Sequence, residues 1–206
     1  AVLRMATTNV TGNVLTGDLA AAAQRSIEAE GALAGVMRPP GEGPWGTPAT
    51  SYSQLNDPLL RFTNPVSGGA EVNALARQLQ AVARMIQASG ALGLKRQVFF
   101  VGLTGFDSHN DQNGNHARLM AQLAQGMSYF DTVLGSMGLR DKVTTFTASD
   151  FGRTFTSNGD GTDHGWGGHQ FVMGGAVRGG DLYGTFPVLA AKNRSNNHFD
   201  GSPDQL

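Results

Sequence analysis

Acidic and imidazole side chains gather after two apolar runs of the sequence. Asp107 and His109 follow the run at residues 97–103, and Asp150 follows the run at residues 142–148. In an extended chain, side chains two positions apart point to the same side, so Asp107 and His109 could hold one ion. A carboxylate beside an imidazole suits zinc, manganese or iron. The alternative for this pair is an Asx turn followed by a surface histidine.

Asp150 offers a second carboxylate near the first. If the two apolar runs form neighbouring strands, Asp150 lies about 5–10 Å from Asp107. Two carboxylates at that distance repel each other unless a cation or Arg153 lies between them. The guanidinium of Arg153 could instead hold an anionic substrate. In the other open interpretation, Asp150 caps a turn and pairs with Arg153.

Two histidines five positions apart, His164 and His169, stand among glycines. Glycine lets the backbone bend, so both imidazoles could reach one centre, with His169 as a further ligand or proton donor. The alternative is a flexible glycine loop with solvated histidines. The preceding residues 158–161 have an incomplete spacing for a calcium loop. Two other histidines are not expected to take part: His116 and His198.

Helical and strand patterns alternate along the chain. We expect helices at residues 18–30, 70–89 and 114–137, and strands at 97–103, 142–148, 170–174 and 182–184. Gly31, Gly90 and Gly138 are the expected helix stops. Such alternation predicts an α/β fold with helices covering a mainly parallel sheet, whose ligand sites lie at the carboxyl ends of the strands. Residues 150–169 are expected to form a long functional loop.

Proline and glycine crowd residues 38–50, which excludes a helix or a central strand there. This segment carries Trp45, which looks exposed in the sequence. It is either a linker packed by its own tryptophan or a lid over a substrate. We find no internal repeat or domain boundary. Residues 1–206 are therefore expected to form a single α/β domain. We expect both ends to be cuts in a larger protein, so that the domain is incomplete at both ends.

The composition excludes several classes of partner and chemistry. The net charge is −1 and 15% of residues are charged, which gives no basic surface for nucleic acid or anionic membranes. The chain has no cysteine, which excludes disulfides, thiolate catalysis and cysteine–zinc sites. No apolar run approaches the roughly 18 residues of a membrane span.

Three stretches in order resemble the bacterial family called domain of unknown function 1501: residues 105–109, 145–154 and 158–169. Residues 174–180 and 200–202 are similar to it as well. The family is grouped with the alkaline phosphatase and sulfatase superfamily. The resemblance therefore implies an α/β sandwich with two divalent metal sites, and a periplasmic or secreted location. It also implies a metal-dependent hydrolase acting on phosphate or sulfate esters, with a small anionic ester or a sugar as substrate.

By this resemblance, Asp107, His109 and His164 bind one divalent ion and Asp150 binds a second, the metal being zinc, manganese or calcium. The sequence departs from the superfamily in two ways. Phe151 stands where a histidine usually follows the second aspartate, and the strand that carries the nucleophile is not found. Activity would then need the missing N-terminal segment or another chain. The alternative is a non-catalytic exported protein that keeps the fold for binding or assembly.

Overall fold

The computed structural model describes residues 14–185. These residues divide into two compact units, residues 14–39 with 84–99 and residues 40–83 with 100–185. The first unit contains helix α2 (Val14–Val36). His198 and the similar stretch at residues 200–202 lie outside the described residues. The single domain expected over residues 1–206 stays a prediction.

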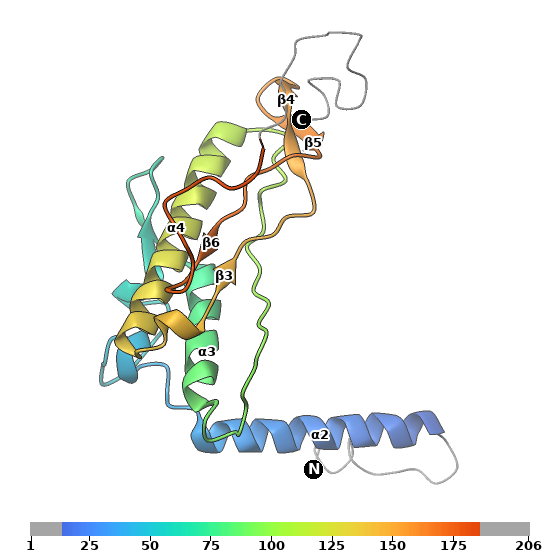
Figure 1. The fold of residues 1–206 in the computed structure, drawn as a ribbon, viewed down its shortest axis with the longest axis vertical. Coiled ribbons are helices and arrows are strands. Elements are labelled where there is room, and N and C mark those ends of the chain that lie inside the picture. Colours follow the sequence, from blue (N-terminus) through green and yellow to red (C-terminus); the bar gives the residue numbers. More distant parts are fainter. Residues whose placement is uncertain (1–13, 186–206) are drawn as a thin grey trace. The chain divides into compact units, whose positions relative to one another are not determined.

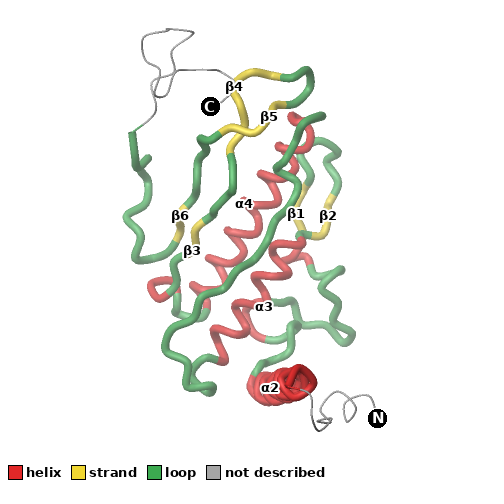
Figure 2. The backbone as a smooth tube through the Cα atoms, turned by 90° about the vertical axis from the view of Figure 1, so that its right-hand side faces the viewer, coloured by secondary structure: helices red, strands yellow, loops and turns green. Residues whose placement is uncertain are grey.

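The second unit carries the candidate site and most of the secondary structure. Its elements in order are η1 (Gly43–Trp45), η2 (Pro58–Leu60), β1 (Arg61–Thr63), β2 (Ala70–Val72), the start of α3 (Ala74–Ala88), α4 (Gln112–Ser136), η3 (Arg140–Lys142), β3 (Thr145–Phe146), β4 (Gly152–Ser157), β5 (Thr162–Gly165) and β6 (Val172–Met173). The strands form three two-stranded antiparallel sheets, β1–β2, β3–β6 and β4–β5 (Figure 2). The fold is thus mixed α/β.

All three predicted helices are present, with shifted ends. Helix α2 extends beyond the expected range and runs through Gly31 and Gly35, so the predicted stop at Gly31 is wrong. Each interior glycine costs about 1 kcal/mol relative to alanine, and the alanine-rich sequence around them tolerates that cost. Among residues 14–185, no helix has both the length and the apolar character required to cross a membrane.

The expected parallel sheet is not formed by the described residues, where every strand pair is antiparallel. Residues 97–103 run as a loop (Figure 1). Within this run Phe100 is 97% exposed, and the side-chain amide of Gln78 bonds both backbone groups of Gly102, at 2.8 and 2.9 Å. A near-continuous apolar run is typical of a strand buried on both faces, and that interpretation is wrong here, because Val98 is 99% exposed as well. The apolar run alone does not specify a partner strand. In the structure, β3 pairs with β6 instead. Residues 182–184 form no strand either.

The segment at residues 38–50 is packed by its own tryptophan. Trp45 has no exposed surface, so the expectation of an exposed side chain is wrong. Its carbonyl oxygen accepts hydrogen bonds from the Gln80 amide at 2.9 Å and from the Tyr129 hydroxyl at 2.6 Å. Gln80 is also fully buried, and it donates a further bond to the carbonyl of Pro40 at 3.1 Å. These bonds fasten the segment to helices α3 and α4.

Helix α3 starts later than predicted because Asn73 caps it. The Asn73 side-chain oxygen accepts hydrogen bonds from the amides of Leu75 (2.9 Å) and Ala76 (3.2 Å). Its side-chain nitrogen donates to the carbonyl of Gln122 (2.7 Å) in α4. Asn73 is completely buried, so one side chain both starts α3 and joins it to α4.

Replacing Asn73 tests this double role. We expect Asn73→Ala to lower the free energy of unfolding by about 2–3 kcal/mol, since it removes the cap and leaves buried groups without partners. Asn73→Asp keeps the capping oxygen and removes the donors, so it separates the two contributions. Urea unfolding followed by circular dichroism measures both. Equal stability of Asn73→Ala and the wild type would contradict the prediction.

Candidate metal centre

Residues 150–169 hold a β-hairpin instead of the expected long loop. Strand β4 pairs with β5, and the register places Arg153 opposite His164. The chain reverses at residues 158–161, where the amide of Asn158 donates to the carbonyl of Gly161 at 3.1 Å. The sequence contained the signal, because Asn-Gly and Asp-Gly pairs between strand-forming runs are typical of hairpin turns.

Close backbone packing fastens this hairpin to the loop before α4. The amide of Gln112 donates to the carbonyl of Asp160 at 3.0 Å, and the Thr162 hydroxyl donates to the Gln112 side chain at 2.7 Å. At Gly161 an added Cβ would lie 2.3 Å from the backbone of His109, so this approach requires glycine. The hairpin and the residues that follow the 97–103 run are thereby brought to one place.

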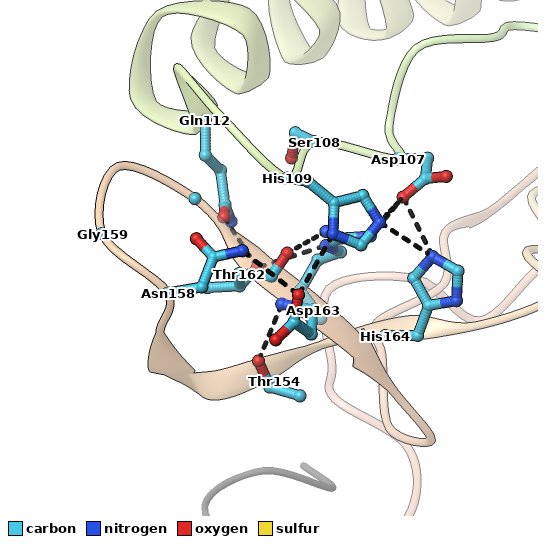
Figure 3. A network of polar contacts seen from close by, with 12 residues as sticks. Asp107, Ser108, His109, Gln112, Thr154, Asn158, Gly159, Thr162, Asp163 and His164 are labelled. Atoms are coloured by element: carbon cyan, nitrogen blue, oxygen red, sulfur yellow. Dashed lines mark hydrogen bonds and ion pairs between the residues drawn. The ribbon is translucent and has the colours of Figure 1, made fainter.

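Three predicted ligands converge there (Figure 3). The Oδ1 atom of Asp107 lies 2.9 Å from Nε2 of His109 and 3.0 Å from Nε2 of His164, and the two Nε2 atoms are 3.2 Å apart. About half of each side chain is exposed. We call these three residues the Asp-His-His cluster. Residues from two of the predicted stretches, 105–109 and 158–169, therefore lie together here.

The donor atoms of the cluster fit a divalent cation. In a tetrahedral zinc site with bonds of about 2.0–2.1 Å, neighbouring ligand atoms lie about 3.3–3.4 Å apart. The three observed separations, 2.9, 3.0 and 3.2 Å, are close to that value. Three protein ligands on an accessible surface leave further coordination positions for water or substrate, as in catalytic zinc sites.

The hydrogen bonding of His109 also indicates that the cluster can hold a cation. Its Nδ1 atom lies 3.1 Å from a carboxylate oxygen of Asp163, which can only accept, so Nδ1 carries the proton. In the neutral ring, Nε2 then presents a lone pair. That lone pair faces another acceptor, the Asp107 oxygen, at 2.9 Å. The two repel each other unless a proton or a cation lies between them.

Arg153 anchors the carboxylate of the cluster. Its Nη1 donates to Asp107 at 2.7 Å, while Nε donates to the Thr162 hydroxyl at 3.2 Å and Nη2 to the Thr162 carbonyl. The bond from Arg153 is the main reason that the pKa of Asp107 lies below its usual value. Desolvation opposes this shift and the bond from His164 adds to it. Asp107 is therefore ionised at neutral pH, as a metal ligand must be.

Phe151 supports His164 from the side. The two rings stack with centroids 3.8 Å apart and an interplanar angle of 16°. The guanidinium of Arg153 lies 5.9 Å from the centroid of the same phenyl ring. The phenyl ring of Phe151 thus restricts the imidazole of His164 by contact with its face.

Two predicted site residues are not part of the Asp-His-His cluster. Within the described part of the chain, the group of potential ligands within 4.8 Å of one another contains neither Asp150 nor His169. Within the described residues, Arg153 forms its ion pair with Asp107. The alternative ion pair between Arg153 and Asp150, which the sequence left open, is not observed there. A second ion at Asp150 and a catalytic role for His169 stay predictions.

Comparison with known protein families shows the family of this chain. The family described as "Protein of unknown function (DUF1501)" matches residues 20–199, which include the whole cluster. The chain belongs to this family. No curated protein and no solved structure matches this DUF1501 protein. The match begins at residue 20, well before the first motif, so it includes most of α2 and the segment at residues 38–50 of the DUF1501 protein as well.

Proposed function

We propose that this DUF1501 protein is a metal-dependent hydrolase of phosphate or sulfate esters. The observation that carries the proposal is the convergence of Asp107, His109 and His164 at hydrogen-bond distances from one another. The ester class comes from the resemblance of the three motifs to the alkaline phosphatase and sulfatase superfamily. The same resemblance supports an exported protein.

The donor set favours a transition metal over calcium. Two imidazoles and one carboxylate suit zinc, manganese or iron, whereas calcium prefers oxygen ligands. When bound, such an ion supplies positive charge that stabilises negative charge on the departing oxygen of an ester. Asp107, His109 and His164 would hold it.

The protein groups around the cluster have separate roles in this proposal. Arg153 keeps Asp107 ionised and oriented, and its side chain is 15% exposed. Three of its nitrogens already donate within the protein, and a guanidinium has five N–H donors. Its two remaining N–H groups could contact an anionic substrate. His169 lies in the glycine-rich segment after β5 and would reach the substrate as proton donor.

A non-catalytic binding protein is the second candidate function. Two observations favour it: Arg153 is already engaged with Asp107 and Thr162, and Asp150 is outside the cluster. With one candidate ion site and no activated nucleophile among the described residues around it, the chain would bind a cation or an anion–cation pair without turnover.

Metal analysis followed by turnover separates these functions. The metal-free protein is titrated with zinc, manganese, ferrous iron and calcium by calorimetry, and hydrolysis of nitrophenyl phosphate and nitrophenyl sulfate is then measured. The hydrolase proposal predicts about one bound transition-metal ion per chain and metal-dependent turnover. Binding without turnover would support the non-catalytic function. A folded protein that binds no ion would refute the metal site.

A further inference from the structure

We propose that Asp163 is a positioning residue that orients His109 and fixes its protonated nitrogen, so that Nε2 faces the other two ligands. This inference rests on the proposed metal site and extends it to a residue that the sequence motifs did not single out. Asp163 is not a ligand in this arrangement. It acts through the far side of the imidazole.

The geometry around His109 assigns this role. One edge of the ring, at Nδ1, faces Oδ1 of Asp163 at 3.1 Å, and the opposite edge, at Nε2, faces Asp107 and His164 at 2.9 and 3.2 Å. Figure 3 shows Asp163 and the remaining cluster residues on different sides of the His109 ring. A carboxylate on the second nitrogen of a ligating histidine sets which nitrogen carries the lone pair and raises the basicity of the ligand.

Neighbouring residues hold Asp163 in place. The side-chain amide of Asn158 donates to the same Oδ1 at 3.1 Å, and the backbone amide of Asp163 donates to the Thr154 hydroxyl at 3.0 Å. Thr154 is buried, so this second bond ties the Asp163 backbone to the interior of the hairpin. The carboxylate itself is 63% exposed, which means that its bond to His109 adds little to folding.

The test compares Asp163→Ala and Asp163→Asn with the wild type and with Asp160→Ala. Asp160 lies in the turn of the same hairpin and is exposed, so its replacement removes an equal charge near the site without touching His109. Zinc affinity is measured by competition with a chromophoric chelator. The tautomer of His109 in the metal-free protein is read from long-range proton–nitrogen correlations. Circular dichroism confirms folding of each variant.

We expect His109 to carry its proton on Nδ1 in the wild type and in Asp160→Ala, and to lose that preference in Asp163→Ala. Zinc affinity should fall 10- to 100-fold in Asp163→Ala, by less in Asp163→Asn, whose amide oxygen can still accept, and remain unchanged in Asp160→Ala. A wild-type His109 protonated on Nε2, or unchanged zinc affinity in Asp163→Ala, would overturn the inference.

The tautomer measurement keeps this inference distinct from the metal proposal. If the wild type binds no zinc, the metal site is refuted. The role of Asp163 is then decided by the tautomer of His109 alone, since that measurement requires no ion.

Discussion

Replacing His164 with alanine should abolish tight binding of a transition metal. His164 supplies one of the three donor atoms, and its Nε2 lies 3.0 Å from Asp107 and 3.2 Å from His109. Loss of a residue that hydrogen-bonds a metal ligand commonly lowers metal affinity 10- to 100-fold. Loss of a ligand itself should therefore lower it more than about 100-fold. Calorimetric titration of the metal-free variant with zinc measures the change.

The fold should survive this substitution, because half of the His164 side chain is exposed and its main contact is the stacked ring of Phe151. His116→Ala is the matched control. His116 is an exposed histidine of α4 whose ring meets Phe106 edge-on, with 6.1 Å between centroids, and it is outside the cluster. Equal zinc affinity in His164→Ala and His116→Ala would show that the cluster does not hold the ion.

Local spacing was enough to predict part of this site. Asp107 and His109 are two residues apart, and a carboxylate and an imidazole at that spacing can share an ion in almost any extended backbone. His164 reaches them because β4 and β5 pair in one register, and a shift of one residue would turn its side chain to the other face. The family resemblance supplied that connection, since spacing alone does not fix a register.

Asp163 shows why outer contacts are harder to predict. Its role depends on which nitrogen of His109 faces it, and this is set by the approach of residues 105–111 to the hairpin turn. The requirement for glycine at position 161 reflects that approach, but the sequence does not say which backbone comes close. The Asn-Gly and Asp-Gly pairs at residues 158–161 were the available signal for the hairpin.

The fold was predictable at the level of helices and less so for strand pairing. Helices α3 and α4 have apolar faces that recur at helical spacing, and such periodicity depends on local sequence alone. Strand partners depend on segments far apart in the chain. Residues 97–103 form an apolar run typical of a buried strand, but they have no partner strand in the described part of the chain. Strand β3 instead pairs antiparallel with β6.

Replacing Trp45 with alanine should cause the largest loss of stability in the second unit. Its side chain is fully buried, and removal of a buried tryptophan costs about 3–5 kcal/mol through lost contacts and the cavity left behind. The backbone around it is already fixed by bonds from Gln80 and Tyr129, so the structure has little freedom to close the cavity. Urea unfolding followed by far-ultraviolet circular dichroism measures the change.

The same variant decides between the two interpretations of residues 38–50. A substrate lid would open and close over the site, so Trp45→Ala would alter the KM for an ester and leave the free energy of unfolding nearly unchanged. A packed linker gives the reverse result. Trp45→Phe is the matched control, because it retains an aromatic ring and leaves a smaller cavity, and it should lose less than half as much stability. Gln80 supports the packed linker: it is completely buried and holds the carbonyls of both Pro40 and Trp45, which fixes this segment at two points.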